Sequence, residues 1–251
     1  MERAEGFTAT LGLVKPGTVD RITQDFWRMT PADVNLTLYG TNWSLKMLHS
    51  GQFDAAAFDI QRDAILEAVR ELLLYHDLDF IAVSGDLIQS AMGPVWDRTL
   101  RESIREAAGV PATTAMTALT DALEHVGARR VAVGTPFREE QNDYVRHYLE
   151  QAGFSVTAVE GYPTRNSKEI RTLPANAAHE SGRKAFLAAP GADAIYLSCP
   201  IWPTTAAVAP LEQEFGVPVV TMFNPILWQG LTAIGYRQPI HGFGRLLETV
   251  G

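Results

Sequence analysis

The sequence lacks most of the features that mark disulfide, membrane or secreted proteins. It has 251 residues and one cysteine, Cys199, so no intrachain disulfide can form and a reducing compartment is indicated. No apolar run reaches the length of about 18 residues that a membrane-spanning helix needs. The first residues have neither the basic nor the apolar stretch of a secretory signal. We therefore expect a cytoplasmic protein without a membrane partner.

Motifs for metals and cofactors are also missing. The six histidines form no HxH or HExxH spacing, and the sequence contains no CxxC, GxGxxG, GxxxxGK[ST] or GxSxG. We expect no metal and no cofactor. The formal charge of −8 comes from 21 basic and 29 acidic residues. It repels polyanions, so nucleic acid is not expected as a partner, while a small anionic substrate is still compatible with it.

Short apolar runs alternate with amphipathic stretches along the chain. The runs predict strands at 11–16, 34–40, 79–85, 110–114, 130–135, 155–160, 194–199 and 217–223. The stretches between them predict helices at about 58–76, 96–108, 117–125, 139–152, 175–188, 204–215 and 225–233. Apolar strands without polar alternation, each followed by a helix, are typical of a parallel sheet covered on both faces.

The second part of the chain repeats landmarks of the first in the same order. Asp79–Gly85 is similar to Asp193–Cys199, and a Gly-Val-Pro triplet follows each of them, at 109–111 and 216–218. The pattern predicts an α/β fold of two similar Rossmann-like halves. Each half has a mostly parallel four-stranded sheet, and a pseudo-two-fold axis relates them with the active site between. We expect residues 1–115 plus about 230–251 in one half and 116–229 in the other.

Ligands of open parallel sheets bind beyond the carboxyl ends of the strands. Cys199 ends a predicted strand just before a helix near Pro203, and a helix N-terminus favours a thiolate that can exchange protons near neutral pH. The alternative is a buried structural cysteine. Asp86, at the equivalent end of the first half, is a second acid/base candidate or a helix N-cap. Lys15 is a candidate partner for a substrate carboxylate or a solvated surface lysine.

Other candidate donors are more ambiguous. Thr18, Thr114 and Asn224 follow predicted strands and could hold a carboxylate, or could cap turns. The polar segment 164–172, with Arg165 and Arg171, could form a lid or a surface loop.

With these residues assembled, the chain resembles the arylmalonate decarboxylase/maleate isomerase branch of the Asp/Glu racemase superfamily. The likeness is carried by the segments 109–114, 127–133, 197–199, 216–220 and 242–246, and by Trp228. It implies two α/β halves around one active site and cofactor-independent proton chemistry. Racemases and isomerases of this group use two cysteines, whereas the decarboxylases have glycine at the first position. The sequence has the decarboxylase pattern, with Gly85 at the first position and Cys199 at the second.

The sequence also departs from that pattern. Where the decarboxylases have side-chain donors for the retained carboxylate, this chain has Asp86, Leu87 and Phe137, and Pro200 replaces a glycine after the cysteine. We expect Cys199 and Asp86 to be catalytic. The residues expected to bind substrate are Gly85, Leu87, Lys15, Pro16, Thr18, Thr114, Phe137, Pro200 and Asn224.

Three functions follow from these expectations. The first is a lyase that decarboxylates a malonate-like acid, with Cys199 protonating the enediolate. The second is an isomerase or racemase in which Asp86 stands in for the missing first cysteine. The third is a non-catalytic protein that binds a small carboxylic acid. The side chain of the substrate stays open, as does a homo-oligomeric state.

Overall fold

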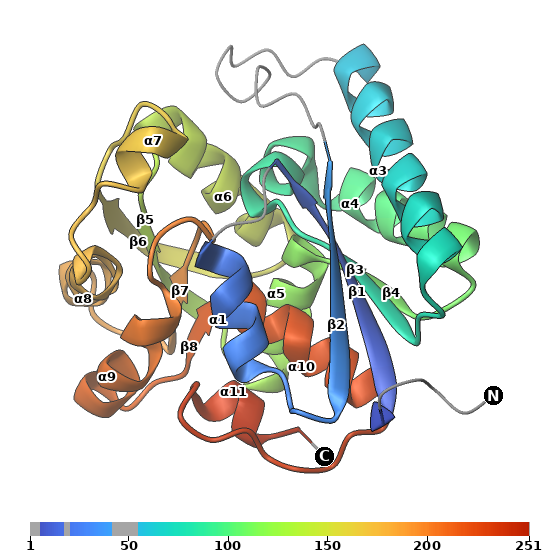
Figure 1. The fold of residues 1–251 in the computed structure, drawn as a ribbon. Coiled ribbons are helices and arrows are strands. Elements are labelled where there is room, and N and C mark those ends of the chain that lie inside the picture. Colours follow the sequence, from blue (N-terminus) through green and yellow to red (C-terminus); the bar gives the residue numbers. More distant parts are fainter. Residues whose placement is uncertain (1–5, 18–20, 42–54, 251) are drawn as a thin grey trace.

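The computed structural model describes residues 6–17, 21–41 and 55–250, with only the backbone given for 21–23 and 55–58. Two parallel sheets organise the chain (Figure 1). The first has the order β2-β1-β3-β4, with β1 (Ala9–Pro16), β2 (Val34–Thr41), β3 (Phe80–Val83) and β4 (Ala112–Thr114). The second has the order β6-β5-β7-β8, with β5 (Arg130–Thr135), β6 (Ser155–Gly161), β7 (Ala194–Leu197) and β8 (Val219–Thr221). All eight predicted strands are therefore present, and the duplicated four-stranded order is confirmed.

The duplication extends to individual hydrogen bonds. Asp79, just before β3, accepts a 2.8 Å bond from the backbone N–H of Thr10, and Asp193, just before β7, accepts one from Arg130. At the other ends of these strands, the backbone N–H of Ser84 donates to Val14 and that of Ser198 donates to Gly134. The equivalent residues in the two halves therefore have equivalent structural roles.

Helices cover both sheets. They are α1 (Arg21–Met29), α3 (Ala55–Tyr75), α4 (Asp86–Ala108), α5 (Ala115–His125), α6 (Glu139–Gln151), α7 (Ser167–Ile170), α8 (Ala177–Ala188), α9 (Thr205–Phe215), α10 (Phe223–Ala233) and α11 (Arg245–Glu248). Successive residues of a strand point to opposite faces of the sheet. In the first sheet both faces are apolar, as two neighbouring residues of β1 show. Leu13 packs in a cluster with residues of α1 and α10, and its neighbour Val14 packs in a cluster with residues of α3 and α4. Figure 1 shows α5 and α10 lying between the two sheets.

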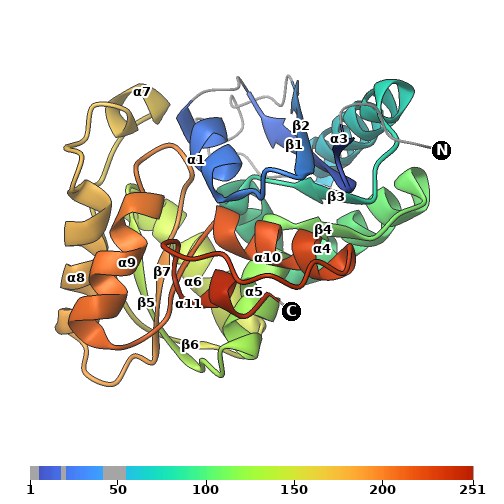
Figure 2. The same cartoon turned by 60° about the horizontal axis from the view of Figure 1, so that its bottom comes forward.

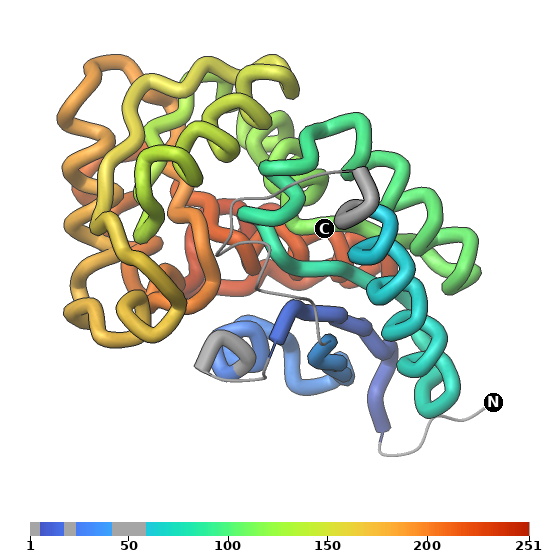
Figure 3. The backbone as a smooth tube through the Cα atoms, turned by 90° about the horizontal axis from the view of Figure 1, so that it is seen from above, coloured from blue at the N-terminus to red at the C-terminus, as the bar shows by residue number. Residues whose placement is uncertain are grey.

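The end of the chain packs against the first sheet. Ile226 and Leu227 of α10 share a buried cluster with Leu11 and Phe80, and Leu247 of α11 joins it. Figure 2 shows α10 running between the two halves with α11 beside it, and Figure 3 shows the orange-red α10 between them from above. The expected division into residues 1–115 plus about 230–251 and 116–229 stays a prediction.

The helix prediction is wrong at one boundary and incomplete at three places. Helix α4 begins at Asp86 instead of near Trp96, because Gly93 has φ 82° and Pro94 follows it, so a kink divides the helical pattern. The short helices α7 and α11 and the helix α1 were not predicted. The strands β3 and β7 end at Val83 and Leu197, earlier than expected. The residues after these strands, among them Ser84, Gly85 and Cys199, therefore lie beyond the strand ends, where they can line a site.

Candidate active site

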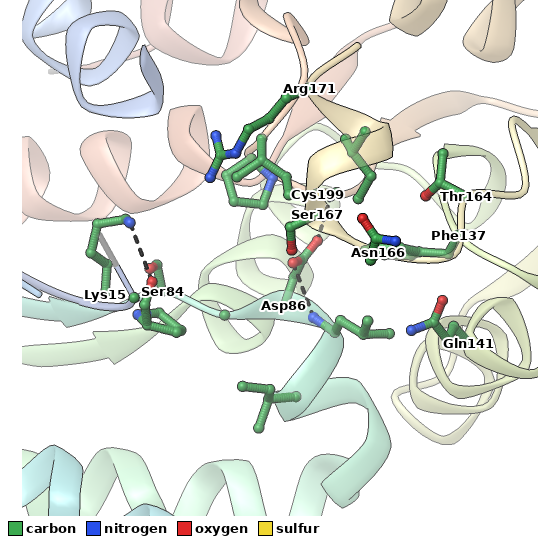
Figure 4. A pocket seen from close by; sticks show the side chains of 18 of the residues that line it. Lys15, Ser84, Asp86, Phe137, Gln141, Thr164, Asn166, Ser167, Arg171 and Cys199 are labelled. Carbon is green, nitrogen blue, oxygen red and sulfur yellow. Dashed lines mark hydrogen bonds between the residues drawn. The ribbon is translucent and has the colours of Figure 1, made fainter. Parts of the chain in front are cut away.

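A cavity of about 160 Å³ lies where the two halves meet, at the carboxyl ends of β1, β3, β5 and β7. Its walls come from the end of β1, the residues that follow β3, β5 and β7, and the segment around α7 (Figure 4). The lining residues are Lys15, Pro16, Gly17, Ser84, Gly85, Asp86, Leu87, Ile88, Phe137, Gln141, Thr164, Arg165, Asn166, Ser167, Ile170, Arg171, Cys199, Pro200 and Ile201. This position is the one expected for ligands of parallel α/β sheets.

Most of the predicted site residues meet in this cavity. Lys15, Pro16, Gly85, Asp86, Leu87, Phe137, Cys199 and Pro200 all line it. Thr18 lies outside the described residues.

Thr114 and Asn224 are not among the lining residues. The Thr114 hydroxyl accepts from the backbone N–H of Thr117 and donates to Asp97, so it caps α5. The Asn224 carbonyl oxygen accepts from the backbone and hydroxyl of Thr221, which organises the turn into α10.

Cys199 adopts a backbone conformation that is uncommon for its residue type. Its φ of 72° is the one positive φ of a non-glycine residue among the described ranges. The thiol is nearly buried yet lines the cavity, and α9 begins only at Thr205. The helix that the sequence predicts near Pro203 is therefore α9, and its first turn begins six residues after Cys199.

The backbone of Cys199 is hydrogen-bonded to the carboxylate of Asp86. One carboxylate oxygen of Asp86 accepts hydrogen bonds from the Cys199 N–H at 2.7 Å and from the hydroxyls of Ser198 and Tyr196 at 2.8 Å each. The other oxygen accepts from the Leu87 N–H at 3.0 Å. Burial and the nearby Asp86 carboxylate raise the pKa of Tyr196 well above its usual value, so its hydroxyl remains a donor.

Asp86 is not the helix N-cap considered above. Gly85 takes that position with φ 119° and ψ 54°, and Asp86 is the first residue of α4. A carboxylate in the first turn of a helix is stabilised by the exposed amides there. Asp86 thus joins the beginning of α4 in one half to the end of β7 in the other.

The cavity carries positive charge even though the chain as a whole is acidic. Its described lining includes three basic side chains, Lys15, Arg165 and Arg171, against the single acid Asp86. Lys15 is 5% exposed, and its ammonium donates to the backbone oxygen of Pro16 at 3.2 Å. In Figure 4, Lys15 and Arg171 lie on one side of the Asp86–Cys199 pair, and Phe137 and Gln141 lie on the other. A small anion therefore meets favourable charge on entering the cavity.

The segment 164–172, which the sequence left open between a lid and a surface loop, lines the cavity at six positions: Thr164, Arg165, Asn166, Ser167, Ile170 and Arg171. Asn166 caps α7 by accepting from the backbone N–H groups of Lys168 and Glu169, and Thr164 anchors the segment by donating to the Pro136 oxygen at 2.6 Å. Ser84, Gln141 and Ile170 line the cavity but were not predicted. Ile170 could have been identified as an apolar residue within a polar segment, whereas nothing in the sequence indicates that Gln141 lines a cavity.

Among the described residues, no group of three or more His, Cys, Asp or Glu side chains is placed to hold a metal ion. Within the same ranges, no helix is long and apolar enough to cross a membrane.

The two-half α/β fold, with a cysteine in the cavity between the halves, is the arrangement of the Asp/Glu racemase superfamily. Within it, the chain belongs to the arylmalonate decarboxylase family, whose model matches residues 28–247.

Relatives in this family are enzymes of two kinds. The chain is 25% identical over 242 residues to arylmalonate decarboxylase of Bordetella bronchiseptica, covering 96% of this chain and 97% of the relative. It is 27% identical over 203 residues to maleate isomerase of Nocardia farcinica, covering 77% of each. Unliganded arylmalonate decarboxylase is similar in structure, with a TM-score of 0.82 at 24% identity over 96% of this chain and all of that chain. These likenesses establish the fold and the family, and they include both a lyase and an isomerase.

Proposed function

We propose that this chain decarboxylates a malonate-type acid without a cofactor and that Cys199 protonates the enediolate intermediate. The observation that carries the proposal is the asymmetry of the cavity. Cys199 follows β7 on one side, while Gly85, which has no side chain, follows the equivalent strand β3. One acid/base group on one side suits a reaction in which carbon receives a proton from a single direction.

The charges of the cavity support a dianionic substrate. Lys15 and Arg171 can hold the carboxylate that the product retains, and Leu87 and Phe137 contribute apolar surface to the same cavity. In the proposed step, the bond between the α-carbon and the departing carboxylate breaks. Its electron pair passes into the retained carboxylate to form the enediolate, and carbon dioxide leaves. The Cys199 S–H bond then breaks, its proton joins the α-carbon, and the thiolate recovers a proton from water.

Negative charge moves towards the retained carboxylate during this step. Preorganised cations and donors that face the growing charge lower the barrier more than they stabilise the substrate. The position of Lys15 supports this role, because a nearly buried ammonium interacts more strongly with an anion than a solvated one.

The experiment measures carbon dioxide release from a panel of aryl- and alkylmalonates in deuterated water. The wild-type chain is expected to release carbon dioxide and to place one deuterium on the product α-carbon. Cys199→Ala is expected to lose about 10²-fold or more in rate, as for removal of a general acid. Undiminished release by Cys199→Ala would remove the cysteine from the mechanism. Melting shifts on binding without turnover by any acid would instead support the non-catalytic carboxylic-acid-binding protein.

A cofactor-independent isomerase or racemase is the second candidate, because the maleate isomerase of Nocardia farcinica is 27% identical over 77% of this chain, compared with 25% over 96% for the decarboxylase. A solved structure of that isomerase, with a TM-score of 0.81 at 20% identity, is described as carrying a covalently bound succinylcysteine intermediate. In this chain Cys199 would act together with Asp86. Against this role, both oxygens of Asp86 accept bonds from neighbouring donors, which leaves its carboxylate poorly placed to take a substrate proton. Conversion of maleate to fumarate, with full loss of rate in Asp86→Asn, would favour the isomerase.

A further inference from the structure

The hydrogen bonds of Asp86 join the two halves at the cysteine. Asp86 belongs to α4 of the first half and is 2% exposed, and its carboxylate accepts three bonds from the end of β7 and the residues after it in the second half: Tyr196, Ser198 and Cys199. A fourth bond comes from Leu87 beside it. The carboxylate accepts all four bonds, and the N–H groups of Leu87 and Cys199 among its partners can only donate.

The bond from Cys199 is made by its backbone N–H, and the backbone of Cys199 has a strained, left-handed conformation. A non-glycine residue in the left-handed region is held there only by its surroundings. The Cys199 N–H donates to Asp86 at 2.7 Å, which is short for an N–H···O bond and typical of a charge-assisted one. Asp86 therefore stabilises the backbone turn that brings the Cys199 side chain to the cavity.

The same contact sets the charge around the sulfur. The sulfur is three covalent bonds from the nitrogen that Asp86 binds, so the carboxylate is a close neighbour of the thiol. A negative neighbour disfavours the thiolate. Other elements contribute three charged groups to the cavity lining: Lys15 on β1, and Arg165 and Arg171, which flank α7. These positive charges favour the thiolate. Arg165 is largely exposed and pairs with Glu169, which weakens its effect.

We propose that Asp86 is a positioning residue for Cys199, which holds the cysteine backbone in its left-handed turn and keeps the sulfur in its protonated, proton-donating form. The role deepens the proposed function and rests on it only for the final transfer of the proton to carbon. A general acid must carry its proton when the carbanion forms, so a carboxylate beside the thiol has a chemical purpose there.

The test uses the fact that Cys199 is the sole cysteine of the chain. The ultraviolet absorbance of the thiolate is recorded against pH on the full chain, and the same titration of Cys199→Ser is subtracted. This measurement needs no substrate, so it is independent of the proposed reaction. In Asp86→Asn the thiol is expected to ionise at a pH lower by about one unit or more, because the negative neighbour is gone. The cavity cations are the same in both proteins, so the difference reports on Asp86.

Two further variants distinguish the effect of the Asp86 charge on the thiol from the effect of a loosened structure. Ser198→Ala and Tyr196→Phe each remove a donor to the Asp86 oxygen and keep its charge, so the thiol is expected to ionise at a higher pH than in the wild type. Loosening of the structure alone would move all three variants in one direction. If Asp86→Asn does not fold, the upward shifts in these two variants carry the test.

The matched control is Asp97→Asn, which removes a buried carboxyl on the same helix that does not line the cavity, and it is expected to leave the thiol titration in place. A wild-type titration in Asp86→Asn, or a downward shift in Ser198→Ala and Tyr196→Phe, would overturn the proposal. If the titration shifts as expected while no malonate is decarboxylated, Asp86 positions the cysteine and the proposed function is wrong.

Discussion

Tyr148 on α6 donates a 2.8 Å hydrogen bond to the carboxyl of Asp97 on α4, so a buried acid joins helices of the two halves. The hydroxyls of Thr114 and Thr117 donate to the same oxygen, at 2.8 Å each. The other oxygen of Asp97 has no hydrogen-bond partner among the described residues. Burial raises the pKa of Asp97, although the three hydroxyls and Arg101 act in the opposite direction.

The raised pKa of Asp97 predicts stability that falls with increasing pH. The folded chain keeps a proton on Asp97 at a pH where the unfolded chain, with a carboxyl pKa of about 3.9, has released it. The penalty therefore begins above about pH 4 and grows as the pH rises to the folded pKa. Asp97→Asn carries no charge and is expected to be more stable than wild type at about pH 8, by about 1 kcal/mol or more. Urea unfolding at a series of pH values measures both effects.

The control for this prediction is Asp97→Leu. Leucine accepts no hydrogen bond, so the three hydroxyls lose their partner at a cost of about 1–3 kcal/mol for each buried group. Asp97→Leu should therefore be the least stable of the three proteins. Equal losses in Asp97→Asn and Asp97→Leu at neutral pH would contradict the role of charge.

Glycine is required at position 85 for two reasons, which are the backbone conformation there and its place in the cavity wall. Its φ of 119° is in a region that side chains disfavour, so Gly85→Ala is expected to lose about 1–3 kcal/mol of stability. Gly109→Ala is the matched control, because Gly109 ends the same helix at φ 69° with open space around it. Both variants should lose stability in thermal unfolding, and only Gly85→Ala should also lose decarboxylation rate. Equal activity in the two variants would show that Gly85 matters for the backbone alone.

Arg171 is expected to attract the substrate through its charge. Arg171→Gln should raise KM for a dianionic malonate about tenfold, which corresponds to about 1.4 kcal/mol, with a smaller effect on kcat. Lys168→Gln removes the same charge from the adjacent helix α7, but Lys168 is exposed and does not line the cavity, so the KM of this variant should stay that of the wild type. Steady-state kinetics at low salt measures the difference. A similar KM in both variants would mean that the overall field, and not contact with Arg171, attracts the substrate.

Glu212 connects the end of the chain to the second sheet. Its carboxylate is 8% exposed and accepts from the backbone N–H of Val219 at 2.9 Å and from that of Arg245 at 3.0 Å. Glu212→Ala leaves these two amides without their acceptor, so a loss of about 2–4 kcal/mol and faster amide exchange at Arg245 are expected. Glu214→Ala removes surface contacts with Arg183 and His179 and should change stability by less than about 1 kcal/mol. Unchanged exchange at Arg245 in Glu212→Ala would contradict this role.

The strands were predictable because their apolar runs are local and uninterrupted. The repeated Asp79 and Asp193 also carried real information, since each binds the backbone at the start of the neighbouring strand. The first turns of α4 were missed because Gly93 and Pro94 break the local pattern, while contacts with other elements still support a helix there. The short helix α7 was missed because four residues contain too little periodicity to be seen.

The sequence by itself determined the two halves, the parallel sheets and the presence of a lone cysteine opposite a glycine, because these follow from local periodicity and from order along the chain. It left Asp86 open between a proton carrier and a cap. Only the tertiary structure decided which groups surround that carboxylate, because its donors Tyr196, Ser198 and Cys199 are more than a hundred residues away. The same holds for Lys15 and Arg171, whose shared cavity forms when the two halves pack together.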